Sequence, residues 1–172
     1  MLSNKVEQVL NKQIGIEAAS SQVYLAMASW ADINGLTGTA KFMYLHSDEE
    51  RQHMLKLIKF VNDRGGHAII PELAQPKAKY NDINEVFSDL LNHELQVTKS
   101  INEVVHICLE DKDYTTHNFM QWFVSEQIEE EGLARTIMDK LNMIGTDNGN
   151  LYIFDRDLES IVNESIASEA AQ

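Results

Sequence analysis

The chain has 172 residues, of which 44% are hydrophobic and 24% are charged, and its net charge is −13. This composition predicts one globular domain, residues 1–172, with a substantial core. The negative excess disfavours binding to nucleic acid or to anionic membranes, and no apolar run approaches the roughly 20 residues of a membrane span.

Cys108 is the only cysteine. An intramolecular disulfide is therefore impossible, and a reducing compartment is indicated. Residues 1–9 mix polar and apolar side chains and lack the hydrophobic stretch of a secretion signal. We therefore expect a cytoplasmic protein, with Cys108 as a small buried hydrophobic residue.

Apolar residues recur at alternating spacings of three and four in four long stretches, a pattern typical of helices that pack against other helices. The first helix is expected to begin near Ser3 or Asn4, and the third to be capped by Asn81 or Asp82, all good N-cap residues. A shorter amphipathic stretch predicts a fifth helix, and residues 169–172 are expected to fray. The predicted helices cover about residues 4–34, 38–64, 82–110, 114–143 and 155–168.

The connections between these helices decide the topology. Residues 35–38 and 111–113 are short, so each joins two helices into an antiparallel hairpin. The linker over residues 67–81 contains both prolines of the chain and can extend to about 50 Å, whereas a helix of about 28 residues is about 42 Å long. The linker can therefore cross the whole bundle, which predicts an all-α four-helix bundle with one long crossover and a short fifth C-terminal helix.

Each long helix interrupts its own apolar seam with side chains that can bind a metal. A buried carboxylate without a partner costs several kcal/mol or becomes protonated. Glu17 lies 33 residues before Glu50 in the first hairpin. Glu94 lies 33 residues before Gln127 in the second, so the two hairpins place these side chains at one level. The predicted cluster consists of Glu17, Glu50, His53, Glu94, Gln127 and Glu130.

This cluster has the chemistry of a dinuclear metal centre. Its four carboxylates carry a charge of −4, which two divalent cations balance. Oxygen ligands with one imidazole suit iron, manganese or zinc. Because carboxylates also stabilise the higher charge of Fe(III), the centre is suited to oxidising Fe(II) with oxygen. The alternative is that the acids lie on exposed helix faces and that the chain is a purely structural or interaction bundle.

The residues around the cluster resemble those of bacterial non-haem ferritins over nearly the whole chain. The similarity rests on Glu17 with Tyr24, on Glu94, and on the segments SDEERQHM (47–54), WFVSEQIEEE (122–131) and LYIFD (151–155). In ferritin-like di-iron bundles, two helices supply one Glu each and the other two supply Glu-x-x-His.

Two positions distinguish this chain from the bacterioferritins. Its fourth helix has Gln127-x-x-Glu130 where they have Glu-x-x-His, and Arg51 stands where they carry a haem-binding methionine. The resemblance therefore implies iron without haem.

The resemblance also implies roles for the cluster residues. A first iron would be held by the first two helices and a second by the last two, with Glu50 bridging and Gln127 close to the second. The ligands would be Glu17, Glu50 and His53 for the first iron, and Glu94 and Glu130 for the second.

Further roles follow from the same resemblance. Tyr24 is implied as an electron donor or a hydrogen-bond partner of the site, and Trp122 as an electron donor or a packing residue. From its position on the seam, one turn before Glu50, His46 is interpreted as a hydrogen-bonded core histidine in preference to a metal ligand. A third iron would lie on the acidic face of the fourth helix, for which a solvated surface is the alternative. Its ligands would be Glu49, Glu126 and Glu129, with Glu130 shared.

The resemblance implies an iron-storage ferroxidase. Fe(II) would be oxidised by O2 or H2O2 and stored as a ferric mineral inside a homo-oligomeric shell of twenty-four subunits. A di-iron peroxidase of the rubrerythrin type is the alternative, but the chain has no Cys-x-x-Cys module and its fourth helix lacks the second His. At the turn before that helix, an acidic pore lining and a solvated turn are both open interpretations of Glu110, Asp111 and Asp113.

Overall fold

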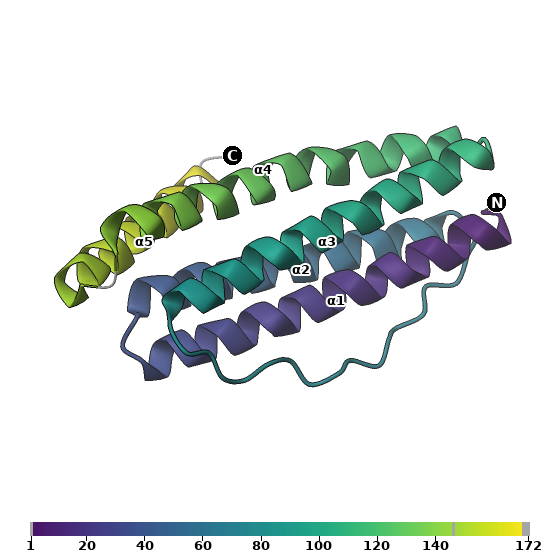
Figure 1. Cartoon of the computed structure of the whole chain (residues 1–172). Helices are drawn as coiled ribbons and strands as arrows, with labels where there is room; N and C mark the ends of the chain where they lie inside the picture. Colours follow the sequence, from purple (N-terminus) through teal and green to yellow (C-terminus); the bar gives the residue numbers. More distant parts are fainter. Residues whose placement is uncertain (1, 146, 170–172) are drawn as a thin grey trace.

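The computed structural model describes residues 2–145 and 147–169, which form five helices and no strand (Figure 1). Four long helices lie side by side, and the fifth lies at one end of the bundle. This is the predicted all-α fold, a four-helix bundle with an additional C-terminal helix. The helices are α1 (Asn4–Ile33), α2 (Thr37–Asp63), α3 (Ile83–Glu110), α4 (Tyr114–Ile144) and α5 (Asn148–Glu169).

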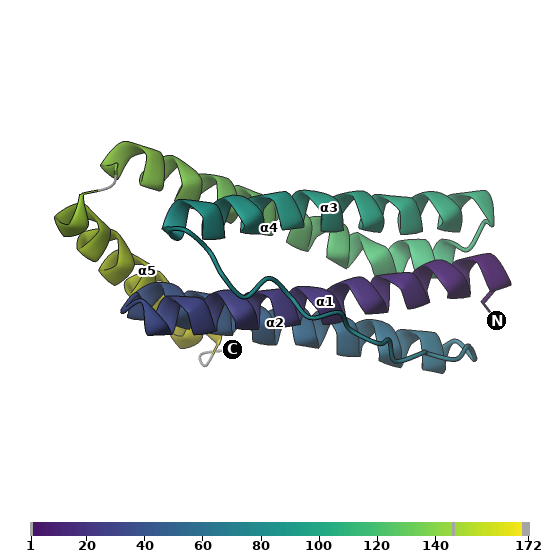
Figure 2. The same cartoon turned by 60° about the horizontal axis from the view of Figure 1, so that its bottom comes forward.

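The crossover between α2 and α3 runs the length of the bundle along α1 (Figures 1 and 2). Near its start, the side chain of Asn11 bonds the carbonyl of His67 at 3.0 Å and the amide of Ile69 at 2.7 Å. At its end, the indole of Trp30 donates to the carbonyl of Tyr80 at 3.1 Å. The predicted topology of two antiparallel hairpins joined by a long crossover is therefore confirmed.

Three helices begin at a residue whose side chain accepts a backbone N–H of the first turn. Such N-caps stabilise a helix by about 1 kcal/mol each. Ser3 and Asp82 are among the caps that the sequence predicts. The caps are Ser3 for α1, Asp82 for α3 and Asp113 for α4.

Helix α2 lacks a cap of its own, because its N-cap residue is Leu36. Asp155 of α5 supplies one. Its carboxylate accepts hydrogen bonds from the N–H of Gly38 at 2.9 Å, from the N–H of Thr39 at 2.7 Å and from the Thr39 hydroxyl at 2.8 Å. A Cβ at Gly38 would lie only 1.8 Å from the Asp155 carbonyl oxygen, so only glycine allows this approach. Helix α5 is thereby tied to the start of α2.

Helix α5 is longer than the sequence pattern predicts. It begins at Asn148 rather than near residue 155, and it includes Glu169, which was expected to fray. The early start has a local cause, since Asp147 accepts the N–H of Gly149 through its carboxylate and the N–H of Leu151 through its carbonyl, both at 2.9 Å. The remaining tail, residues 170–172, lies outside the described residues.

The apolar core falls into two clusters. One lies toward the α5 end of the bundle and includes Met27 and Phe87. The other lies toward the N-terminus and includes Leu10, Val104 and the buried Cys108, which is the environment predicted for this cysteine. The polar interruptions of the four helical seams fall between the two clusters.

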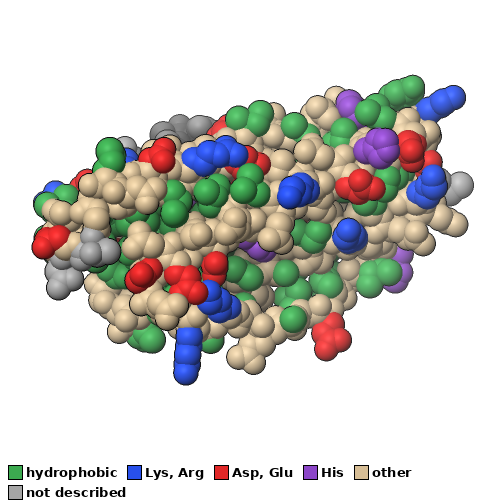
Figure 3. All heavy atoms as spheres, in the orientation of Figure 1, with side chains coloured by type: hydrophobic (Ala, Val, Ile, Leu, Met, Phe, Trp, Pro, Cys, Tyr) green, Lys and Arg blue, Asp and Glu red, His purple; other side chains and the backbone are tan. Residues whose placement is uncertain are grey.

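The surface is mixed in charge. On the face shown in Figure 3, Lys and Arg side chains are dispersed among Asp, Glu and hydrophobic side chains. That face therefore has no continuous basic strip of the kind that binds nucleic acid. None of the helices in the described part of the chain has the length and apolarity needed to cross a membrane.

Candidate metal centre

Three of the predicted ligands meet between α1 and α2. Glu17, Glu50 and His53 each offer one ligand atom, and these atoms all lie within 4.8 Å of one another. The three residues are 1%, 3% and 7% exposed, so the group lies inside the bundle. The heptad-like spacing that placed them on the seams of their helices is the local reason for this convergence.

The carboxylates of this group are short of hydrogen bonds. Glu17 accepts one from the side-chain amide of Gln13 at 2.8 Å. Its other oxygen, and the Oε2 atom of Glu50, are buried without a hydrogen-bond partner, although Glu50 Oε2 lies 3.6 Å from His53 Nδ1. Buried polar atoms without a partner are rare in proteins. A cation placed among these oxygens and the imidazole would satisfy them, so the residues present fit a metal.

Burial also changes the protonation of these acids. It raises the pKa of Glu17 well above the usual range, and the neighbouring charge of Glu50 raises it further. Burial is likewise the main cause that raises the pKa of Glu50 to about 8 and the pKa of Glu130 to about 7. Without cations, several of these carboxyls therefore hold a proton near neutral pH. A divalent cation would replace those protons.

Glu94 lies on α3 and is 1% exposed. Its two oxygens accept hydrogen bonds from the phenol of Tyr24 and, at 3.1 Å, from the side-chain amide of Gln127. The structure therefore brings these three predicted residues together, with Tyr24 in one of its two predicted roles. Glu94 and Glu130 line the same small cavity, but among the described residues Glu94 belongs to no three-ligand group.

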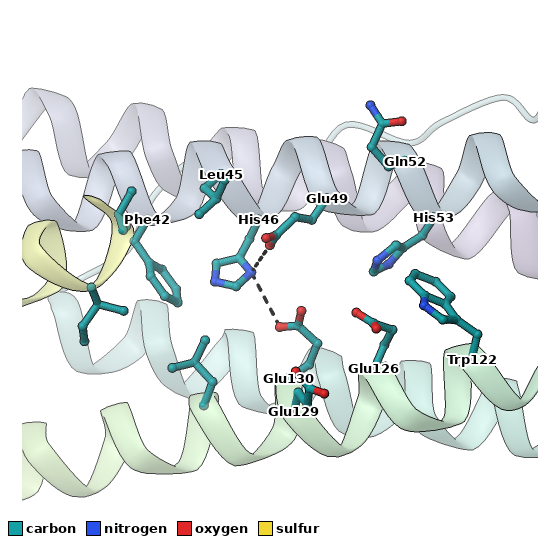
Figure 4. Close-up of a pocket in the computed structure, with 13 residues that line it drawn as sticks. Phe42, Leu45, His46, Glu49, Gln52, His53, Trp122, Glu126, Glu129 and Glu130 are labelled. Carbon is teal, nitrogen blue, oxygen red and sulfur yellow. Dashed lines mark ion pairs between the residues drawn. The ribbon is translucent and has the colours of Figure 1, made fainter. Parts of the chain in front are cut away.

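Glu130 contributes instead to a second group of possible ligands. His46, Glu49 and Glu130 each offer an atom within 4.8 Å of the others. His46 Nδ1 lies 2.8 Å from Glu49 Oε2 and 3.6 Å from Glu130 Oε2, as Figure 4 shows. Burial lowers the pKa of His46, but the contact with Glu49 and the charge of Glu130 outweigh it, so the pKa is raised. The histidine is buried and paired as predicted, and it also stands among metal-type ligands.

The remaining predicted residues line a cavity of about 590 Å³ between α2 and α4. Glu126 and Glu129 face this cavity from α4, while Glu49 faces it from α2 (Figure 4). Burial raises the pKa of Glu126. The predicted third set is thus arranged around one cavity, but only Glu49 and the shared Glu130 belong to a tight group. His46, interpreted from the sequence as a core histidine, is the member not predicted as a ligand, although its spacing of three residues from Glu49 is a usable signal.

The acidic turn between α3 and α4 is largely engaged in structural contacts. Asp113 caps α4 and pairs with Arg64 of α2 at 3.1 Å. Asp111 accepts a hydrogen bond from the Ser3 hydroxyl, and Glu110 lies 3.9 Å from Lys5. Of the three candidate pore residues, Asp111 and Asp113 thus hold the ends of helices together.

Comparison with known proteins gives the family. Residues 7–144 match the family model described as the ferritin-like domain. The chain belongs to the ferritin-like family. It is 44% identical over 161 residues to a probable bacterial non-haem ferritin-like protein of Haemophilus influenzae, covering 94% of this chain and 98% of the relative. It is 42% identical to the bacterial non-haem ferritin of Campylobacter jejuni, covering 94% and 96% of the two chains.

The fold of this ferritin-like chain agrees with solved structures. An open-pore ferritin from the archaeon Archaeoglobus fulgidus superposes with a TM-score of 0.91 at 38% identity, covering 92% of this chain and 98% of that one. These relatives confirm the predicted family and, with it, the predicted function of iron storage by a ferroxidase. Nothing in the comparisons favours the rubrerythrin-type alternative.

Proposed function

We propose that this ferritin binds Fe(II) as substrate at a dinuclear centre in the middle of the bundle. Glu17, Glu50 and His53 would hold the first iron. The buried convergence of these three residues, with a carboxylate oxygen on each Glu lacking a hydrogen-bond partner, is the observation that carries the proposal.

The second iron would lie between Glu94 and Glu130, with Glu50 bridging. These two acids line the same small gap in the packing, and Glu94 already accepts a hydrogen bond from Gln127. Gln127 holds an oxygen of Glu94 and would offer its own carbonyl oxygen once a cation takes the carboxylate. Tyr24, 1% exposed, would hold the other oxygen and keep Glu94 oriented.

A third iron would occupy the α2–α4 cavity. We propose Glu49, Glu126 and Glu129 as its ligands with Glu130 shared, and the geometry adds His46 to the Glu49 side. Because Glu130 faces both this group and the dinuclear centre, it would connect the two. The negative cavity wall would also attract Fe(II) from solution.

The storage function requires a shell. We propose a cytoplasmic homo-oligomer of 24 subunits without haem, which oxidises Fe(II) with O2 or H2O2 and keeps the ferric mineral inside. Large apolar side chains on the outside of this single chain support contacts between copies, since Ile33 is 82% and Tyr152 71% exposed. The non-haem ferritins among the relatives, and Arg51 at the position of the bacterioferritin methionine, support the lack of haem.

Aerobic addition of Fe(II) to the purified protein tests the proposal. We expect a soluble ferric core that far exceeds what the three proposed positions hold. Iron that stops at those positions would refute storage. Rapid oxidation should be lost in Glu50→Ala and Glu130→Ala and kept in Glu72→Ala, which alters an exposed acid of the crossover. Unchanged oxidation in both site variants would refute the proposed centre.

A further inference from the structure

Lys56 covers the face of an aromatic ring at the edge of the proposed centre. Its ammonium nitrogen lies 3.1 Å from the centroid of the Trp122 ring. The same indole packs against His53 in an edge-to-face arrangement, with ring centroids 5.2 Å apart and planes at 81°. Figure 4 shows Trp122 beside His53 and Glu126. Trp122 thus has a proposed iron ligand at one side and a cation over its face.

The position of this cation has a redox consequence. A cation is attracted to an aromatic face by the negative charge of the π-system. Removal of one electron makes the ring positive, so the same ammonium group then repels it. Lys56 therefore stabilises the reduced indole relative to the oxidised one. Helix α2 supplies Lys56 and His53, and helix α4 supplies Trp122, so two packed helices hold the cation and both aromatic side chains in place.

Tyr24 of α1 is the other oxidisable side chain beside the proposed ligands. It is buried, and its hydroxyl donates to the carboxylate of Glu94. Among the described residues, no Lys or Arg group lies over its ring. Two oxidisable side chains thus flank the centre, and only the indole carries a cation on its face within the described residues.

We propose that Lys56 is a positioning residue that keeps Trp122 reduced against an oxidant formed from O2 or H2O2 at the centre. The source of the oxidant rests on the proposed function, whereas the electrostatic effect of Lys56 does not. Each one-electron step reduces the oxidant by one electron. An oxidised indole would lose its N–H proton to solvent.

The test uses the metal-free assembled protein and azide radicals generated by irradiation. Each azide radical takes one electron from the indole and becomes azide anion. Oxidised Trp122 is then measured by peptide mass spectrometry. Lys56→Gln should raise its yield by about twofold to thirtyfold, the factors that correspond to the roughly 0.5–2 kcal/mol of a cation–π contact. Lys56→Arg, which retains the charge, should match the unaltered protein.

Lys59→Gln is the matched control, because Lys59 lies on the same helix but pairs with Asp63 on the surface. It should leave Trp122 oxidation unchanged. Acrylamide quenching of Trp122 fluorescence, isolated by subtracting the signal of the same protein with Trp122→Phe, separates charge from simple exposure. Equal yields in Lys56→Gln and the unaltered protein, or an increase fully matched by greater quenching, would overturn the proposal. Failure of the iron centre in the Glu50→Ala assay would leave this metal-free result unaffected.

Discussion

Replacing Glu50 by Gln removes a buried titratable group while keeping the shape of the side chain. Glu50 is 3% exposed, one of its oxygens lacks a hydrogen-bond partner, and burial raises its pKa from 4.5 to about 8. In the metal-free protein the folded state therefore holds a proton that the unfolded state releases between these two values. Stability must fall as the pH rises through this window, because the unfolded state binds fewer protons.

The size of this effect follows from the same pKa values. At pH 7 the solution lies two and a half pH units above the unfolded value of 4.5, and each unit contributes about 1.4 kcal/mol. Glu50 therefore destabilises the metal-free protein by about 3 kcal/mol at pH 7. A neutral Gln avoids this cost. Glu50→Gln should thus increase the free energy of unfolding by about that amount at pH 7 and by little at pH 5.

Urea unfolding of the metal-free protein, followed by circular dichroism at pH 5, 6, 7 and 8, measures the difference. Glu72→Gln, which changes an exposed acid, is the control and should show no such trend. Zn(II), which is not redox-active, should stabilise the unaltered protein more than Glu50→Gln, in which only the second ligand group of His46, Glu49 and Glu130 is intact. A Glu50→Gln effect that is independent of pH, or that weakens as the pH rises, would refute the reasoning about the buried carboxylate.

Three further predictions follow from the fold and the second ligand group. Asp155→Ala leaves two backbone N–H groups and a hydroxyl of α2 without their acceptor. It should therefore lower the free energy of unfolding by about 3 kcal/mol and lower Tm by about 6–12 °C in a thermal scan. Asp157→Ala, which changes an exposed acid, should not lower Tm. Gly38→Ala should destabilise through its clash with the Asp155 backbone, while Gly132→Ala, with nothing near its Cβ, should stabilise by about 1 kcal/mol; equal unfolding free energies would contradict both. His46→Ala should remove one bound Zn(II) per chain in calorimetry and leave the others, and full occupancy would contradict its place among the ligands.

The helices and the first ligand group could be predicted because both depend on local spacing. The three-four alternation fixes which side chains share a helix face, and two short connections force antiparallel hairpins. Equal separations of Glu17 from Glu50 and of Glu94 from Gln127 then indicate a common level. The structure brings Glu17 to Glu50 and Glu94 to Gln127, the contacts that this spacing predicts.

Features that depend on tertiary packing could not be predicted in the same way. The early start of α5 depends on the carboxylate and carbonyl of Asp147, and Gly149 in isolation indicates a helix end. Whether Glu130 joins Glu94 or His46 depends on side-chain rotamers across α2, α3 and α4, on which sequence spacing carries no information. The same holds for Lys56 over Trp122, since no periodicity pairs a lysine of α2 with an indole of α4.

The division of the core into two apolar clusters explains how a costly site is held in place. The clusters on either side fix the spacing of the helices through hydrophobic burial. The acids between them are therefore held close together although they do not stabilise the bundle themselves. In the metal-free protein these acids are partly protonated, with Glu130 near a pKa of about 7. Cation binding must therefore release protons, and affinity should rise with pH up to about 8, the pKa of Glu50. Near neutral pH the proposed centre would bind iron only as tightly as its proton competition allows, which would suit a site that passes its iron on to a mineral.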